Sequence, residues 1–482
     1  MKTLKLFFWL AMFAVVACQN EVVTDNKLTH GVESEVYAVS SDSSVVPLEQ
    51  ALKYLDEMIT ELYPPTRSVR KPSYSASNVE TFVIPQATRS NTQVDLPDTL
   101  VYIVPFEESA GYAILGAQSS ISPVYAITES GDFDNAKFAE AIEYDINNNI
   151  LTEEECLERE ANDSLADVHD NYNSNSDSIV YSLLASTIID DVVMGDLIIL
   201  DPTPVVPPPP TPTLIRTEKY TTMEIIENYP PLLTTEWHQH EPFNLSCKNN
   251  DGVVCPAGCT VIAVAQIIAY HEFPQNRFYC GLPVSWSLVK SYDYNTTYDP
   301  DSPIATQLSS LCCELGKSYL CDVVYTPSGS TSNATKAKRA LENLGYRNVD
   351  KRLGLEQADI DAIINMVKNN KPTYVGAHTS DLNGHALVYD GYVKRRTKTY
   401  TTHYFSDGSV NTMISYGSTQ DLFHLAWGYS NGMHNGYYIA KNEIDSNERY
   451  ARIQDRTSSS DTNDPSMYRY YDCYFRVLTY DL

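Results

Sequence analysis

The chain has 482 residues, which is long for one hydrophobic core and predicts two or more folded units. Hydrophobic residues make up 43% of it, enough to build packed cores, which excludes disorder throughout. Lys and Arg number 34 against 62 Asp and Glu, so the formal net charge is −28. A chain this acidic is repelled by phosphate backbones, which disfavours nucleic acid as a partner.

The first residues predict export. Lys2 and Lys5 precede an apolar run over residues 6–17, the layout of a signal peptide rather than of a spanning helix of about 20 residues. The run ends in Val-Val-Ala-Cys at residues 15–18, which resembles the bacterial lipobox. This predicts a signal peptide over 1–18, Cys18 as lipid anchor and a location in the bacterial cell envelope, with ordinary cleavage nearby as the alternative.

Residues 19–44 are polar and aperiodic, as expected of a linker. A folded unit over 45–200 follows, and its first helix is predicted at 48–62, where apolar residues recur every three or four positions. Strand-like runs follow, with residues 107–109 as a hairpin turn between the second and third; they cover 81–84, 100–106, 111–115 and 123–127. A helix before a meander predicts a small α+β unit.

The proline-rich stretch 201–212 cannot join a helix or a sheet, so it predicts a solvated spacer within a linker over 201–220. The second unit then covers 221–482. Helices are predicted at 259–270, 335–344 and near 357–369, followed mostly by strands, which indicates an α+β fold.

Cys259 follows a glycine and opens an apolar helical run. A thiol at a helix N-terminus is favoured as thiolate, its nucleophilic form, because free N–H groups and the helix dipole stabilise negative charge. His385 heads an alternating strand 126 residues later and supplies a candidate base. A Cys on a helix and a His on a strand is the papain-like arrangement.

The other cysteines weigh less. Setting Cys18 aside leaves nine of the ten, an odd number, so at least one thiol should stay free. Cys312, Cys313 and Cys321 lie near an apolar segment, where buried thiols or a local disulfide are expected. Cys255 and Cys259 with His271 suggest a metal site only weakly, because no second closely spaced ligand pair is present; no metal and no cofactor are predicted.

Three motifs in this order resemble the streptopain (C10) family of cysteine peptidases. They are AGC-x-x-x-A-x-AQI around Cys259, GHA-x-V-x-DGY around His385 and Phe-His-Leu-Ala-Trp-Gly at 423–428. The block 99–133 is similar to the family's inhibitory propeptide domain. The resemblance covers about residues 45–135 and 228–482. It implies a papain-like catalytic domain, preceded by a propeptide that inhibits it.

The resemblance also assigns supporting residues. Gln239 occupies the position where the family has an oxyanion-hole glutamine, and Trp427 is expected to cover the ring of the catalytic histidine. Where the family motif has Asn, this chain has Ala426, which puts the orientation of that ring in question. His424 is expected to be a core histidine without catalytic role.

The resemblance therefore implies an endopeptidase, made as a zymogen, that attacks protein or peptide substrates through Cys259 and His385. Its activating cut is expected within the exposed stretch 202–220, near 214–220, and the mature enzyme can leave the membrane-anchored propeptide. Two alternatives stay open: a catalytically impaired surface binding protein with the peptidase fold, suggested by Ala426, and a transferase or amidase that uses the same acyl-thioester chemistry.

Overall fold

The computed structural model describes residues 21–22, 45–65, 70–82, 99, 101–118, 122–133, 212–353, 357–378, 384–429, 434–440 and 473–482. The predicted signal peptide with Cys18, nearly all of the linker 19–44 and the proline-rich stretch up to residue 211 lie outside these ranges and stay predictions. No helix in the described part of the chain is long and apolar enough to cross a membrane.

The predicted helices are confirmed. The α-helices of the described ranges are α1 (Leu48–Leu62), α5 (Cys259–His271), α6 (Trp286–Lys290), α7 (Pro303–Leu315), α8 (Ala334–Leu344) and α9 (Gln357–Lys368). Local sequence sets their ends: the Ser302 side chain caps α7, Asn333 caps α8, and Gly345 ends α8 with a left-handed φ of 101°. The apolar stripe of α1 is buried, as its periodicity predicts.

One sheet of 13 described strands joins the two predicted units. Its main path runs β11-β17-β12-β13-β15-β16-β5-β4-β3-β2, with β6 and β14 on β13 and β1 on β14. The strands of this sheet are β1 (Glu21–Val22), β2 (Glu80–Phe82), β3 (Val101–Pro105), β4 (Tyr112–Gly116), β5 (Val124–Thr128), β6 (Leu214–Tyr229), β11 (Arg347–Leu353), β12 (Thr373–His378), β13 (Gly384–Phe405), β14 (Val410–Tyr416), β15 (Gln420–Ala426), β16 (Gly436–Ala440) and β17 (Cys473–Asp481). Two small hairpins stand apart: β7 (Phe278–Tyr279) with β8 (Leu282–Pro283), and β9 (Val324–Thr326) with β10 (Gly329–Thr331).

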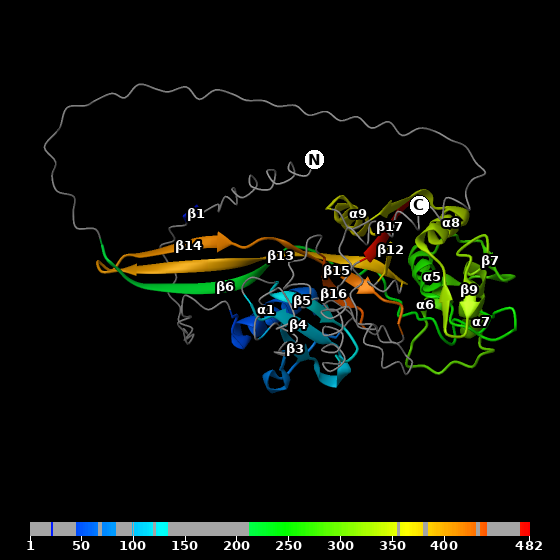
Figure 1. Cartoon of the computed structure of the whole chain (residues 1–482), viewed down its shortest axis with the longest axis horizontal. Coiled ribbons are helices and arrows are strands. Elements are labelled where there is room, and N and C mark those ends of the chain that lie inside the picture. Colours follow the sequence, from blue (N-terminus) through cyan, green and yellow to red (C-terminus); the bar gives the residue numbers. More distant parts are fainter. Residues whose placement is uncertain are drawn as a thin grey trace, which may run out of the picture.

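The N-terminal unit, residues 45–133, docks on the C-terminal unit edge to edge. Strand β5 pairs antiparallel with β16, with Thr128 opposite Gly436 and Ala126 opposite Tyr438. The predicted hairpin turn at 107–109 is a short 3-10 turn between β3 and β4. In Figure 1 the blue and cyan elements of this unit lie below the middle of the sheet, and the helices α5 to α8 lie at its far end. The α+β prediction is confirmed, but the two units share a sheet.

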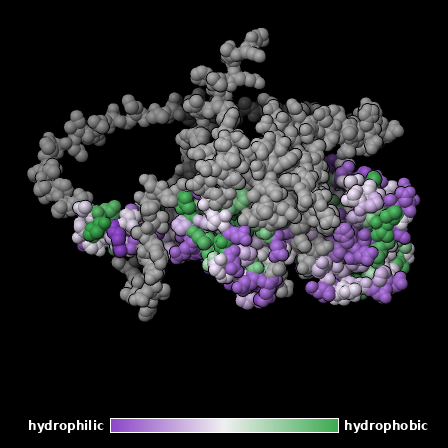
Figure 2. Space-filling view, turned by 60° about the horizontal axis from the view of Figure 1, so that its bottom comes forward, coloured by the Kyte–Doolittle hydropathy of each residue, from purple (hydrophilic) through white to green (hydrophobic). Residues whose placement is uncertain are grey.

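A three-stranded arm leaves the body of the molecule. Strands β6 and β14 flank the distal half of β13 (Figure 1). Strand β6 begins at Leu214, so residues 214–220 of the linker predicted over 201–220 belong to a sheet. The physical reason is that β-branched and aromatic residues follow the last proline, and every backbone N–H there can join a ladder. Figure 2 shows apolar side chains at the end of the arm, where Leu214 and Val410 are exposed.

The core of the C-terminal unit surrounds α5. Ten consecutive residues of this helix, from Thr260 to Ala269, are buried. A helix that is apolar all round fits only inside a protein. It packs against β12 and β13 on one side and against α7 and α8 on the other. This burial fixes the position of Cys259 at the first turn of α5, close to the sheet.

Candidate active site

Cys259 is the first residue of α5, directly after Gly258. Gly258 has a φ of 95°, a conformation that L-residues with a side chain rarely adopt, so glycine is required at this turn. The backbone N–H of Ala386, the residue after His385, is directed at the Cys259 sulfur, and so are the N–H groups of Thr260 and of Cys259 itself. The structure thus brings Cys259 next to the strand that carries His385.

Two opposite effects act on the pKa of the Cys259 thiol. Burial raises the pKa of the Cys259 thiol above its ordinary value, and the surrounding N–H groups offset only part of that rise. The thiolate expected from the position of Cys259 at a helix N-terminus stays a prediction.

His385 lies in β13 and is buried. Its Nε2 donates a hydrogen bond to the backbone carbonyl O of Trp427 over 2.7 Å. A carbonyl oxygen only accepts hydrogen bonds, so Nε2 carries a proton and Nδ1 is the basic nitrogen of the neutral ring. The ring also stacks on Trp427, at 5.9 Å between centroids, and on Tyr429, at 4.9 Å. The Trp427 ring thus lies against that of His385.

The Trp427 carbonyl resolves the question that Ala426 raised. Ala426 is buried at the end of β15 and lies opposite Val388 in the sheet. Ala426 has no side-chain amide oxygen such as an Asn would supply. The backbone oxygen of the next residue, Trp427, instead accepts the hydrogen bond from the N–H of His385. The orientation of His385 therefore does not depend on the side chain at 426.

Gln239 lies close to the loop that leads to Cys259. Its backbone carbonyl accepts a hydrogen bond from the N–H of Ala257 over 2.8 Å. The residue is half-buried, and within the described ranges its side-chain amide makes no hydrogen bond. An amide N–H at this place is suited to an oxyanion, but the role of Gln239 in an oxyanion hole stays a prediction.

His424 belongs to a separate cluster of buried charges. Its Nδ1 lies 2.7 Å from Asp390 Oδ1, and its Nε2 lies 3.6 Å from Glu129 Oε2 of the N-terminal unit. Burial alone would lower the pKa of His424, but the two carboxylates raise it to about 9. Asp390 Oδ2 also accepts the backbone N–H of Leu233 over 2.9 Å. The cluster joins the N-terminal unit to β13 and β15, and no part of it contacts Cys259.

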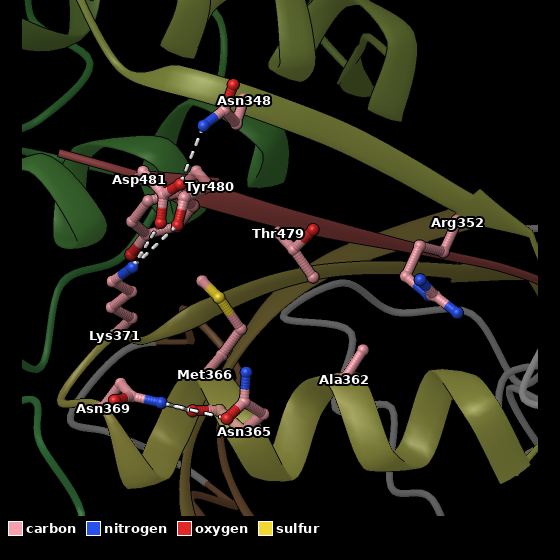
Figure 3. Close-up of a pocket in the computed structure, with 10 residues that line it drawn as sticks. All are labelled: Asn348, Arg352, Ala362, Asn365, Met366, Asn369, Lys371, Thr479, Tyr480 and Asp481. Carbon is pink, nitrogen blue, oxygen red and sulfur yellow. Dashed lines mark hydrogen bonds and ion pairs between the residues drawn. The ribbon is translucent and has the colours of Figure 1, made fainter.

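One cavity lies apart from these residues. A cavity of about 280 Å³ opens between β11, α9 and β17 (Figure 3). Its charged groups are already paired, since Lys371 Nζ lies 2.7 Å from Asp481 Oδ1, and the Asn348 amide donates to Asp481 Oδ2. None of the candidate catalytic residues lines it. Among the described residues, no group of three or more His, Cys, Asp or Glu is arranged to hold a metal ion.

Residues 237–438 match the model of the Peptidase C10 family. These residues belong to the Peptidase C10 family. The family match contains both Cys259 and His385, together with Gln239 and Trp427. For these residues, the predicted membership in the streptopain-like family of cysteine peptidases is confirmed.

Curated relatives of the C10 segment carry the name streptopain. Streptopain of Streptococcus pyogenes is 25% identical over 206 residues, which cover 38% of this chain. Streptopain of serotype M1 of the same species is 24% identical over 206 residues. The chain spans 44% of the length of these relatives.

Two solved structures from Prevotella intermedia are similar to this chain. A fragment of prointerpain A aligns with 83% of this chain and 98% of its own, at a TM-score of 0.42 and 17% identity. Active wild-type interpain A aligns with 52% of this chain and 95% of its own, at a TM-score of 0.35 and 20% identity.

Three residues near the C10 site escaped sequence reasoning. Tyr429 stacks on His385, Asn435 bonds to Trp427, and Glu129 pairs with His424. Tyr429 lies two positions after the predicted Trp427, so the motif gave a signal for it. Nothing in the sequence relates Glu129 to His424, because these residues come from different units that meet only in the folded chain.

Proposed function

We propose that the chain is the precursor of a bacterial cysteine endopeptidase, with Cys259 as nucleophile and His385 as general base and acid. The observation that carries this proposal is the hydrogen bond from His385 Nε2 to the Trp427 carbonyl. It fixes the ring in the tautomer whose Nδ1 can accept a proton, beside the strand residue whose N–H contacts Cys259. Membership in the C10 family supports the same assignment.

The reaction proceeds in two stages. The Cys259 thiolate, formed when His385 takes the thiol proton, attacks the carbonyl carbon of a peptide bond. The carbonyl electron pair moves to oxygen, where Gln239 and the backbone N–H of Cys259 stabilise it at about 3 kcal/mol per donor. The C–N bond then breaks as His385 protonates the leaving amine. Water attacks the thioester, gives a proton to His385, and releases the acid and Cys259.

The N-terminal unit acts as the inhibitor. Support comes from the pairing of β5 with β16 and from the bond of the Glu129 N–H to the Asn435 carbonyl, both next to the site. A cut between residues 134 and 220 frees this unit from the peptidase. Strand β6 begins at Leu214, which favours a cut before that residue, because a protease needs an accessible, unpaired segment. N-terminal sequencing of active material locates the cut.

The proposal also includes export of the chain from the cytoplasm. The basic residues, the apolar run and Cys18 at the N-terminus support a lipid-anchored precursor in the cell envelope, with mature enzyme released after the cut. Palmitate labelling of cells that express the wild-type chain or Cys18→Ser tests the anchor. Label on both chains, or on neither, contradicts it.

The test of the activity is casein hydrolysis by the chain without residues 1–18, before and after limited proteolysis, with Cys259→Ala as the control. We expect activity to appear on nicking and to be absent from the control. If nicked wild-type chain stays inactive, and a thiol-reactive peptide probe leaves Cys259 unlabelled, the proposal fails in favour of a binding protein. Amine acceptors in the same assay separate hydrolysis from acyl transfer by the products formed.

A further inference from the structure

Asn435 lies just before β16 and takes no part in the reaction described above. Its side-chain Oδ1 accepts a hydrogen bond from the backbone N–H of Trp427 over 2.9 Å. The carbonyl of the same Trp427 accepts the hydrogen bond from His385 Nε2 over 2.7 Å. Asn435, the backbone of Trp427 and His385 therefore form one continuous chain of hydrogen bonds.

The backbone at Trp427 needs this support because the sheet ends there. The last pairs of β15 are Leu425 with Gly436 and Ala426 with Val388. Gly428 follows with a φ of 72°, so the chain turns away at once. Trp427 follows the last residue of β15, and the bond from its N–H to Asn435 is one of the local contacts that direct its backbone.

The N-terminal unit binds the same residue. The backbone N–H of Glu129 donates to the backbone carbonyl of Asn435 over 2.7 Å, directly after the pairing of Thr128 with Gly436. Asn435 thus uses two different oxygens. Its side-chain oxygen holds the Trp427 backbone, and its main-chain oxygen holds the docked unit.

We propose that Asn435 is a positioning residue for His385, acting through Trp427, and that Glu129 braces it while the N-terminal unit is docked. The inference rests on the proposed peptidase activity. This role requires a side chain with an acceptor oxygen at the position of Asn435 Oδ1. Asp meets the demand, whereas Ala and Leu do not.

The experiment compares nicked Asn435→Ala, Asn435→Asp and wild-type chains in peptide hydrolysis across pH. For Asn435→Ala we expect kcat to fall about 10- to 100-fold, because a misplaced base loses its near-attack geometry. KM should change little, and the acid limb of the kcat profile should move, because the His385 tautomer is no longer fixed. Asn435→Asp should stay close to wild type. Asn411→Ala, on the exposed arm, serves as the matched control.

A second measurement separates positioning from docking. Hydrogen exchange at the β5 and β16 amides of uncut chain should be unchanged in Asn435→Ala, because Glu129 binds the main-chain oxygen. If Asn435→Ala does not fold, Asn435→Leu keeps the side-chain volume without the acceptor and takes its place. If Asn435→Asp loses as much activity as Asn435→Ala, the inference is overturned. An unchanged kcat and pH profile in Asn435→Ala overturns it as well. Inactive nicked wild type overturns the proposed function and this inference together, whereas active wild type with an indifferent Asn435 overturns the inference alone.

Discussion

At the scale of single residues, the site depends on backbone atoms as much as on side chains. The N–H of Ala386 contacts the Cys259 sulfur, and the carbonyl of Trp427 holds His385. Backbone groups are present whatever the side chain is. The Asn of the family motif can therefore be replaced at Ala426 without loss of the acceptor that fixes the histidine.

Ala426→Asn tests this directly. Because Trp427 already orients His385, we expect no gain in kcat/KM of nicked chain. Ala426 is buried at 2% exposure, so the new amide enters an apolar site, and the free energy of unfolding should fall by about 1–3 kcal/mol. Hydrolysis assays and urea unfolding measure the two effects. Ala358→Asn, at an exposed position of α9, is the control; a tenfold gain of activity in Ala426→Asn would contradict this account of the site.

At the scale of elements, the contact between β5 and β16 carries charge as well as sheet pairing. Glu129, directly after β5, lies 3.6 Å from His424 on β15. Glu236 lies near the same carboxylate: desolvation raises the pKa of Glu236 first, and the charge of Glu129 raises it further. The carboxylate of Glu129 is thus attracted to His424 and repelled by the charge of Glu236.

Substitutions of Glu129 and of Glu236 should change the docking of the N-terminal unit in opposite directions. Glu129→Gln removes the attraction to His424, so the amides of β5 and β16 in uncut chain should exchange faster, by about tenfold. Glu236→Gln removes the repulsion and should slow the same exchange. Glu49→Gln, on the exposed side of α1, should change nothing. Equal shifts in all three variants would mean that a general loss of charge, rather than the pair with His424, acts on the interface.

At the scale of the whole molecule, buried histidines make stability depend on pH in two directions. His238, His271 and His434 have a pKa lowered to about 4, chiefly by burial. They fold as neutral rings, so stability falls as pH drops from about 6.5 towards 4. His424 has a pKa raised to about 9, so its contribution is complete below about 6.5 and is lost as pH rises through 9.

The uncut chain should therefore be most stable near pH 6.5 and lose stability between about 6.5 and 9. Buried Cys and Tyr groups with raised pKa values act mainly above about 9, so this window belongs to His424. Its full contribution is about 3 kcal/mol at most. Urea unfolding of Cys259→Ala chain at several pH values measures the slope, and His424→Gln or the milder Glu129→Gln should flatten it. A slope that survives in both variants would assign it to other groups.

The sequence alone determined what depends on local chemistry and on motif spacing. Residues 259–270 formed the predicted helix because they are apolar throughout, and 48–62 formed another because their apolar positions recur at helical steps. The motifs around Cys259, His385 and Trp427, in this order, predicted the family. The fold then brings the three residues to one site. The prolines predicted a spacer over 201–212 within a linker over 201–220, but residues 214–220 of that linker form part of β6 because they pair with β13.

Only the tertiary structure decided the properties that depend on distant segments. The desolvation that raises the pKa of Cys259 depends on the packing around it, which the position at a helix start does not reveal. The shared sheet, the pair of Glu129 with His424 and the bond of Asn435 to Trp427 each join residues that are far apart in the chain or held by a turn. Burial and long-range pairing are set by the packing of the whole chain, so the residues that hold the site in place became visible only in the fold.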